Sequence, residues 1–226
     1  MSERVAIVVG AGGELGRATA EKLAAAGFTV VGTDRSEKGL KELPDGIRRE
    51  VADPVDPVSA RSVVDRIAAE VGPPEVLVNT IGMYHLGDAL TATQEDLRLM
   101  MDVNMGSALW LTQAMVPYLR ERGSGSIVHV AARPGLEPTA GMATYAVSKA
   151  ALVHLTRVLD LELRPLGIRV NAVAPQLLDT AATRQFVPPE VLTHAVTPEA
   201  IADILAYLAS DAAAPVSGAV IPAYGA

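Results

Sequence analysis

Short, continuous hydrophobic runs alternate along this chain with longer segments in which hydrophobic residues return every three or four positions. The first pattern is typical of parallel strands buried on both faces, and the second is typical of helices that bury one face. The expected strands cover residues 5–9, 28–33, 47–51, 75–79, 125–131, 168–174 and 218–222. The expected helices cover residues 17–26, 58–71, 93–121, 142–164 and 198–209.

The regular alternation of strands and helices predicts an α/β fold, because each strand can be followed by a helix that returns the chain to the same edge of the sheet. Neither a repeat nor a linker divides residues 1–226. We therefore expect a single doubly wound domain, with a parallel sheet of about seven strands.

Composition narrows the possible partners. The chain has 226 residues, is 50% hydrophobic and carries a net charge of −7 without a basic cluster, which argues against nucleic acid or an anionic membrane as partner. It contains no Cys, no signal-peptide pattern and no apolar run of the roughly eighteen residues that a membrane span needs. We expect a cytoplasmic protein. Its four histidines lack the spacing of metal ligands, so no metal site is expected.

A glycine-rich turn follows the first expected strand directly and leads into the first helix. It contains Gly10, Gly12, Gly13 and Gly16, with Leu15 before the last glycine. Glycine lets the backbone bend sharply and approach a ligand, and the N–H groups at a helix start attract phosphate. The turn predicts a Rossmann-type dinucleotide-binding site.

The second expected strand ends at Asp34, which is followed by Arg35. A carboxylate at this place can accept hydrogen bonds from the adenosine ribose hydroxyls and would repel a 2′-phosphate. Asp34 therefore favours NAD over NADP, although an arginine such as Arg35 can also hold a phosphate.

Tyr145 and Lys149 lie four residues apart in the expected helix 142–164, so they share one helix face. A nearby ammonium group favours the phenolate and lowers the pKa of a tyrosine, which suits that tyrosine to exchange protons near neutral pH. The same spacing occurs on ordinary helix surfaces, so the pair indicates a catalytic site only in combination with the glycine turn upstream.

Taken together, these features resemble the short-chain dehydrogenase/reductase family over nearly the full length of the chain. The matching pieces are the turn at 10–16, Asp34, Asp53, the segment 79–82, Asn104, the strand start 125–128, Tyr145 with Lys149, the segment 169–175 and Ser217 with Gly218.

The resemblance implies a role for each cofactor-binding residue. Asp53 would contact the adenine. Asn79 and Gly82 would line the cofactor cleft, and Pro175 would belong to the same site. Thr180 would bond the carboxamide of the nicotinamide. The segment from Thr180 to Pro198 would cover the substrate, with side chains that include Arg184, Gln185, Phe186 and His194.

The same resemblance implies an NAD(H)-dependent oxidoreductase that moves hydride between the nicotinamide and a small carbonyl or alcohol substrate. Tyr145 would exchange the substrate proton. Lys149 would hold the nicotinamide ribose and lower the pKa of Tyr145, and Asn104 would anchor a water in the proton relay. Relatives of this kind form homodimers or homotetramers through two long helices, here 93–121 and 142–164.

Three positions depart from the family pattern. Glu14 stands where the glycine turn usually has a further glycine, and Gln176 replaces the glycine that commonly follows Pro175. The family's catalytic serine lies thirteen residues before the tyrosine, and Ala132 occupies that position. A methyl group cannot hydrogen-bond a substrate oxygen, and losing one such donor typically costs on the order of 10²–10³ in rate.

Three explanations for Ala132 remain open. A neighbour, Thr139, Thr144 or Arg133, could supply the donor. The substrate could be activated already, as in dihydropteridine reductases, which resemble this chain in their variant glycine turn and in an alanine at the serine position. Finally, the protein could bind a dinucleotide as a regulator and catalyse little.

Overall fold

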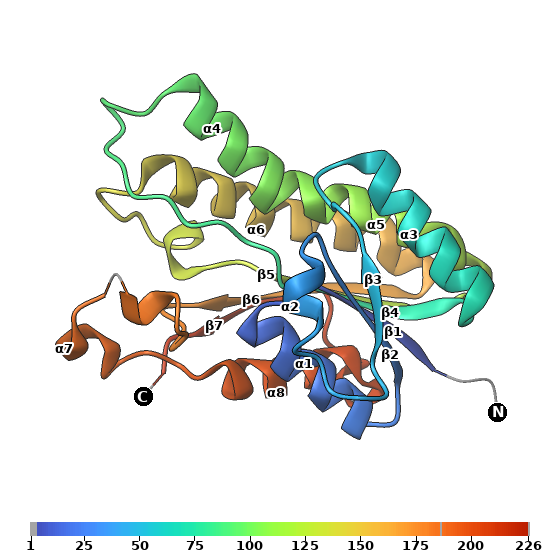
Figure 1. Ribbon diagram of the computed structural model, residues 1–226. Coiled ribbons are helices and arrows are strands. Elements are labelled where there is room, and N and C mark those ends of the chain that lie inside the picture. The colour runs from blue at the N-terminus through green and yellow to red at the C-terminus, as the bar shows by residue number, and fades with distance from the viewer. Residues whose placement is uncertain (1–3, 186, 226) are drawn as a thin grey trace.

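The computed structural model describes residues 4–185 and 187–225. In this part of the chain, seven parallel strands form one sheet in the order β3-β2-β1-β4-β5-β6-β7 (Figure 1). The strands are β1 (Val5–Val9), β2 (Thr29–Asp34), β3 (Arg48–Val51), β4 (Pro74–Asn79), β5 (Gly125–Val130), β6 (Ile168–Pro175) and β7 (Val220–Ala223). The expected α/β fold with a seven-stranded parallel sheet is confirmed.

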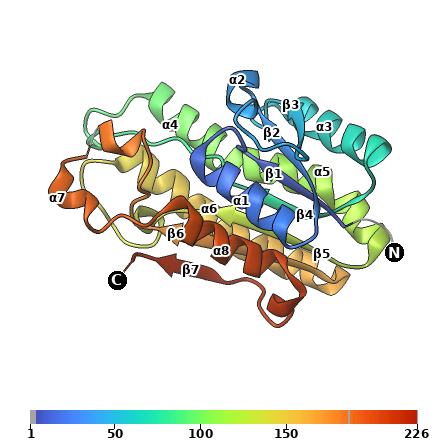
Figure 2. The same cartoon turned by 60° about the horizontal axis from the view of Figure 1, so that its bottom comes forward.

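Helices cover both faces of the sheet. They are α1 (Glu14–Ala25), α2 (Glu37–Leu40), α3 (Pro57–Glu70), α4 (Gln94–Met101), α5 (Ser107–Arg122), α6 (Ala143–Leu163), α7 (Pro189–Leu192) and α8 (Pro198–Ala209). Figure 1 shows α3, α5 and α6 on one face and α1 with α8 on the other, and Figure 2 shows α1 and α8 side by side. None of the described helices has the length and apolar character that crossing a bilayer requires.

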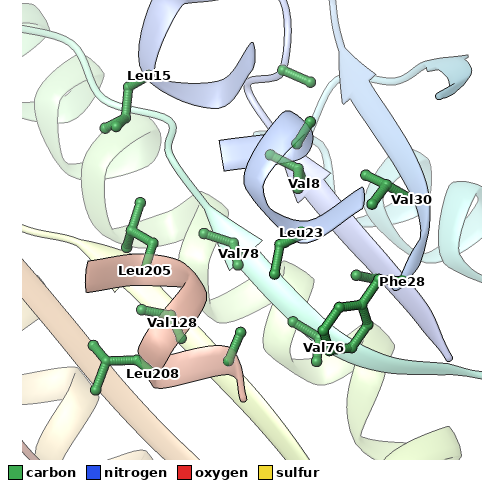
Figure 3. Close-up of a cluster of buried hydrophobic side chains, with 14 of the residues drawn as sticks. Val8, Leu15, Leu23, Phe28, Val30, Val76, Val78, Val128, Leu205 and Leu208 are labelled. Atoms are coloured by element: carbon green, nitrogen blue, oxygen red, sulfur yellow. The ribbon is translucent and has the colours of Figure 1, made fainter. Parts of the chain in front are cut away.

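Two hydrophobic layers hold the helices on the sheet. Between the sheet and the α1–α8 pair, Leu23 and Leu205 are fully buried against Val8, Val78 and Val128 (Figure 3). Full burial of such a side chain contributes roughly 1.5–3 kcal/mol. A second layer packs α3, α5 and α6 on the opposite face. Because both faces are covered, the central strands need hydrophobic residues at every position, which explains their continuous runs.

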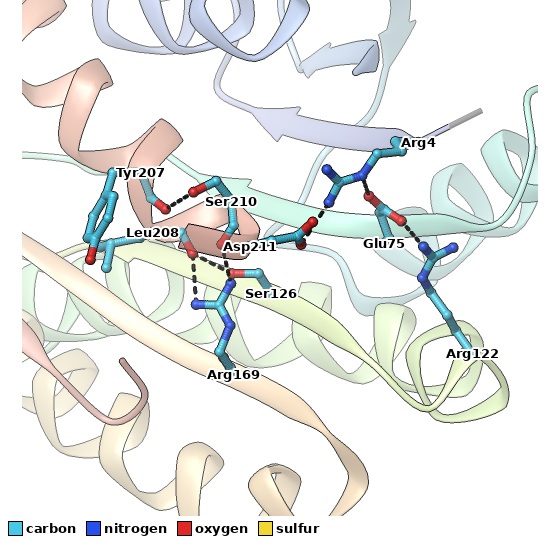
Figure 4. A network of polar contacts seen from close by, with 9 residues as sticks. All are labelled: Arg4, Glu75, Arg122, Ser126, Arg169, Tyr207, Leu208, Ser210 and Asp211. Atoms are coloured by element: carbon cyan, nitrogen blue, oxygen red, sulfur yellow. Dashed lines mark hydrogen bonds and ion pairs between the residues drawn. The ribbon is translucent and has the colours of Figure 1, made fainter. Parts of the chain in front are cut away.

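The amino ends of the strands are joined by charged side chains. Glu75, near the start of β4, lies between the guanidinium groups of Arg4 and Arg122 (Figure 4). Arg169, near the start of β6, donates from Nη1 to the carbonyl oxygen of Leu208 at 2.9 Å and from Nη2 to that of Ser210 at 3.0 Å. These contacts tie the sheet to the end of α8.

The prediction of one continuous α-helix over 93–121 is wrong, because the structure divides this segment into two α-helices. It begins as expected, with Thr93 capping α4, but a π-helical turn over Asp102–Gly106 separates α4 from α5. The turn carries Asn104, whose side chain is fully buried. An inserted π turn changes the direction of one side chain without ending the helix, and such turns are frequent at functional sites.

The first helix also differs from its expected bounds, because α1 starts at Glu14 and not at residue 17. Gly13 is extended at the helix start, with φ −88° and ψ 163°, and its N–H donates to the Gly10 carbonyl oxygen at 3.1 Å. The glycine turn is therefore completed within four residues, and the helix begins directly after it.

Candidate active site

A cavity of about 510 Å³ opens at the carboxyl ends of the strands. In parallel α/β sheets, ligands bind at this edge, beside the point where the strand order reverses. Here that point lies between β1 and β4, which are neighbours in the sheet. Six of the expected site residues line the cavity: Leu15, Gly82, Tyr145, Lys149, Pro175 and Thr180.

The glycine turn is tightly packed against the start of α1. Gly10 has φ +82°, a conformation that other residues rarely adopt, and a Cβ atom on Gly16 would lie 2.1 Å from the Gly10 carbonyl oxygen. Both glycines are therefore required for α1 to pack against the turn. No side chain caps the start of α1, so its first N–H groups are free to bind an anion.

Asp34 lies against this turn. Its Oδ2 accepts the N–H of Gly12 at 3.2 Å, and its Oδ1 accepts the N–H of Ser36 at 2.9 Å. A Cβ atom on Gly12 would lie 2.9 Å from Oδ2, so the missing side chain allows the close approach. Arg35 follows on the surface. The arrangement holds a carboxylate beside the glycine turn, where an adenosine ribose could reach it.

Asp53 and Asn79 each accept a hydrogen bond from a backbone N–H group shortly after a strand, Asp53 after β3 and Asn79 at the end of β4. Asp53 follows β3, and its Oδ1 accepts the N–H of Val55 at 3.0 Å. Asn79 ends β4, is buried, and accepts the N–H of Ile81 through Oδ1 at 3.1 Å. Both side chains shape loops at the same edge of the sheet, although neither lines the cavity.

Lys149 and Tyr145 lie on one face of α6, as expected. Lys149 is buried, and its Nζ donates to the Val130 carbonyl oxygen at 2.8 Å. A Cβ atom on Gly82 would lie 3.0 Å from Nζ, so this glycine keeps the space beside the ammonium group open. The ring of Tyr145 packs edge-on against that of Tyr84, with centroids 5.2 Å apart.

The pKa of Tyr145 differs from the sequence-based expectation. Burial, and to a smaller extent Tyr84, raise the pKa of Tyr145 above its ordinary value, whereas a lowered value was expected from Lys149. Burial also lowers the pKa of Lys149 to about 7. The physical reason is that both groups lose contact with water, which disfavours the phenolate and the ammonium ion alike.

Asn104 joins the segment after β4 to α6. Its Oδ1 accepts the N–H of Met83 at 2.8 Å, and its Nδ2 donates to the Met83 carbonyl oxygen at 3.0 Å and to Ser148 Oγ at 2.9 Å. Ser148 Oγ in turn donates to the Tyr145 carbonyl oxygen at 2.7 Å. The side chain of Asn104 therefore fixes the wall of the cavity next to Tyr145.

Ala132 follows β5 and lines the cavity, so a methyl group occupies the place of the expected hydroxyl. None of the three neighbours named as possible donors is among the described residues of the lining. Thr139 Oγ1 donates to the Glu137 carbonyl oxygen at 3.2 Å, and Thr144 Oγ1 lies 3.4 Å from His85 Nδ1. Arg133 Nη1 donates to Gln176 Oε1 at 2.9 Å.

Much of the remaining wall was not predicted, because it comes from irregular segments after β4, β5 and β6. It includes Met83, Tyr84, Met142, Leu177 and Leu178, whereas Val187 lies in the segment 180–198 that was expected near the substrate. The signal available in the sequence was their position just after expected strand ends, where ligand-binding loops are common. Phe186, expected near the substrate, lies outside the described residues, and Arg184 forms an ion pair with Asp179.

Within residues 4–185 and 187–225, no three His, Cys, Asp or Glu side chains are placed so that they could hold a metal ion together.

Comparison with known proteins agrees with this geometry. The family model described as short chain dehydrogenase matches residues 4–190. The 3-oxoacyl-[acyl-carrier-protein] reductase FabG of Escherichia coli is 32% identical, over 98% of this chain and 96% of its own. Meso-2,3-butanediol dehydrogenase of Serratia marcescens is 31% identical, over 98% and 93%.

A solved structure also resembles this chain over nearly its whole length. The crystal structure of gox2181 superposes with a TM-score of 0.91 at 28% identity, covering 98% of this chain and 94% of its own. With the family match extending over most of the chain, and with Leu15 at the start of α1 lining one cavity with Tyr145 and Lys149, this chain belongs to the short-chain dehydrogenase family of oxidoreductases.

Proposed function

We propose that the protein is an NAD(H)-dependent oxidoreductase that interconverts a small carbonyl compound and its alcohol. The observation that carries this proposal is the cavity into which Tyr145, Lys149 and the start of α1 at Leu15 all face. When bound, the nicotinamide cofactor gives up or takes the hydride. The names of two relatives, a 3-oxoacyl reductase and a butanediol dehydrogenase, support the carbonyl and alcohol class.

Tyr145 moves the proton in this proposal. During reduction, its hydroxyl group donates a proton to the substrate oxygen as that oxygen gains negative charge, and the phenolate then recovers a proton from solvent. During oxidation the transfer runs in reverse. The raised pKa keeps the hydroxyl of Tyr145 protonated before reduction but makes it a weaker acid, so the step needs a positive charge nearby that stabilises the phenolate.

Lys149 and Asn104 support this step. The buried ammonium group of Lys149 lies beside Gly82, where a ribose hydroxyl could approach it. In its protonated form, Lys149 would stabilise the phenolate that forms transiently, and because burial lowers its pKa to about 7, this support weakens above pH 7. Asn104 holds the Gly82–Met83 segment against α6 and is the proposed anchor of the proton relay.

The remaining expected residues form the cofactor site in this proposal. The turn of Gly10, Gly12, Gly13 and Gly16 receives the pyrophosphate, Asp53 and Asn79 border the adenine side, and Pro175 and Thr180 border the nicotinamide side. Asp34 selects NAD, because its carboxylate, held beside Gly12, would repel the 2′-phosphate of NADP.

A Tyr145→Phe variant tests the proposal. We expect it to lose turnover of 3-oxo esters and diketones with NADH, because no proton donor of the right kind remains. NADH binding, followed by fluorescence, should stay nearly unchanged. Normal turnover by this variant, or loss of NADH binding without loss of the chemical step, would contradict the role of Tyr145.

A second candidate is the reduction of an activated substrate such as a quinonoid dihydropterin. Ala132 in the cavity wall favours it, because an electron-poor substrate needs less hydrogen bonding at its acceptor atom. Rapid reduction of a quinonoid pterin together with slow reduction of simple ketones would select this function. Binding of NADH without turnover of either class would instead identify a regulator.

We also propose that the protein assembles as a homodimer or homotetramer through α4, α5 and α6. Leu97 and Leu99 of α4 are each 44% exposed, and Leu161 of α6 is 70% exposed. Exposed leucines on neighbouring helices are typical of interfaces. Light scattering of the purified protein measures the mass, and a monomer at micromolar concentration would contradict the proposal.

A further inference from the structure

We propose that the side-chain amide of Gln176 donates the hydrogen bond to the substrate oxygen that a serine at position 132 would otherwise supply. The inference rests on the proposed carbonyl chemistry. It assigns a catalytic contact to a residue that departs from the family pattern, and it connects that departure with the one at Ala132.

The two departures lie next to each other in the sheet. β5 and β6 are parallel neighbours in which Val130 pairs with Val173. The N–H of Ala131 donates to the Val173 carbonyl oxygen at 2.7 Å, which continues the pairing beyond the strand end. Ala132 therefore stands level with the end of β6, directly before Gln176. Both residues line the cavity.

The amide of Gln176 has a defined orientation. Arg133 Nη1 donates to Gln176 Oε1 at 2.9 Å. A guanidinium group has no acceptor, so the amide oxygen must face Arg133 and the NH₂ group must point elsewhere. Two N–H donors are therefore available on the side of the amide that is turned away from Arg133.

Arg133 is itself held in place, which makes it a positioning residue. Its Nε donates to Glu137 Oε2 at 2.8 Å, and its guanidinium carbon lies 4.9 Å from the centre of the Tyr224 ring. The backbone of Gln176 is also fixed, because its N–H donates to the Ala223 carbonyl oxygen of β7 at 3.3 Å. A preorganised donor of this kind loses little freedom when a substrate binds.

Some other polar side chains of the described lining already use a hydrogen in a bond within the protein. Thr80 Oγ1 donates to the Val9 carbonyl oxygen at 2.8 Å, and Lys149 Nζ donates to the Val130 carbonyl oxygen at 2.8 Å. Thr180 and Thr183 bond each other through their hydroxyl groups at 2.8 Å. Among the described lining residues, the competing donors besides Tyr145 are the hydroxyl of Tyr84, the remaining N–H groups of Lys149 and the second hydroxyl hydrogen of the Thr180–Thr183 pair. Gln176 comes directly after β6, whereas Tyr84 comes five residues after β4.

The test measures kcat, KM and NADH affinity with NADH and two probe substrates, ethyl acetoacetate and 2,3-butanedione. We expect Gln176→Ala to lower kcat by about 10²-fold, with NADH affinity within about twofold of the wild type. Gln176→Glu keeps the size but loses the N–H donors when ionised, so it should lose a similar factor. Gln113→Ala, at an exposed position of α5, is the matched control.

Rescue separates a hydrogen-bonding role from a structural one. Adding Ala132→Ser to Gln176→Ala should restore kcat by at least tenfold, because the serine returns a donor to the same oxygen. An unchanged kcat in Gln176→Ala would overturn the inference. It would also be overturned if Tyr84→Phe lowered kcat strongly and the addition of Ala132→Ser to Tyr84→Phe restored it. Absence of turnover by the wild type with both probes would overturn the proposed function and this inference together.

Discussion

The carboxylate of Glu14 accepts a hydrogen bond from the backbone N–H of Ala181, with 2.8 Å between Oε1 and N. Glu14 is the first residue of α1, and Ala181 belongs to the segment after β6 that covers the cavity. Glu14 itself does not belong to the cavity lining. The side chain that replaces a family glycine therefore links the glycine turn to the segment after β6.

Removing the charge of Glu14 should strengthen NADH binding. Glu14→Gln keeps an oxygen that can accept the Ala181 N–H but removes a negative charge next to the expected pyrophosphate. We expect the Kd for NADH to fall roughly threefold to tenfold at low salt, corresponding to about 1 kcal/mol of relieved repulsion. The difference should shrink at high salt, where exposed charges are screened.

Glu21→Gln, on an exposed position of the same helix, is the control and should change the Kd little. Glu14→Ala removes the hydrogen bond as well as the charge, so it should speed trypsin cleavage after Arg184. An equal or weaker affinity in Glu14→Gln would show that the carboxylate does not oppose the cofactor.

Asp34 should control the choice of cofactor. In Asp34→Ser, the acceptor for the ribose hydroxyls and the charge that repels a 2′-phosphate are both lost. We expect the ratio of kcat/KM for NADH to that for NADPH to fall by at least about tenfold, since juxtaposed like charges cost several kcal/mol. Asp45→Ser, on an exposed turn, is the control. A preference for NADPH in the wild type would refute the assignment of Asp34.

The strands could be predicted from the sequence because this sheet is covered on both faces. Val5–Val9 is buried at every position, so its hydrophobic run cannot be interrupted. The glycine turn could be predicted for a similar reason, since Gly10 and Gly16 occupy places that a Cβ atom cannot share. In both cases a local physical requirement limits which residue types can occupy the position, and this limit can be recognised in the sequence.

Other structural features depend on contacts between residues far apart in the chain, so no local sequence pattern predicts them. The π turn carries Asn104, which is hydrogen-bonded to Met83, 21 residues away. The hydrophobic period of the helix continues through the turn, so the pattern does not reveal it. The raised pKa of Tyr145 follows from burial against Tyr84. The contact between Arg133 and Gln176 joins residues 43 positions apart, so Arg133 could be named only as a possible direct donor.

Lys149 should make stability depend on pH. Burial lowers the pKa of Lys149 from 10.5 to about 7, so between these values the unfolded chain binds a proton that the folded chain does not. The free energy of unfolding should therefore rise with pH from about 7 towards 10, by at most ~1.4 kcal/mol per pH unit from this group. Below pH 7 both states are protonated, and the cost of the buried charge is fully present.

Urea unfolding of the wild type and of Lys149→Met at several pH values between 7 and 9.5 measures this effect. The variant should lack the part of the rise that Lys149 causes, so the difference between the two proteins should itself change with pH. Parallel pH profiles would show that Lys149 stays charged in the folded protein.

Asn104 should stabilise the fold as well as support catalysis. Asn104→Ala would leave the N–H and carbonyl groups of Met83 without the partners that they have in the folded protein. An unsatisfied buried polar group costs about 1–3 kcal/mol, and because Met83 is half-buried and lines the cavity, we expect a loss of roughly 1–2 kcal/mol in the free energy of unfolding. Ser148→Ala removes only one of the bonds to Asn104 and should cost less.

Because the Met83 segment forms part of the cavity wall beside Tyr145, Asn104→Ala should also lower kcat. The two effects can be separated by adding substrate and NADH at saturation, since ligands that bind only the folded state restore stability but not the position of the wall. A lower kcat with an unchanged free energy of unfolding would mean that Asn104 acts in the proton relay alone. A loss of stability with normal kcat would mean that it serves only the fold.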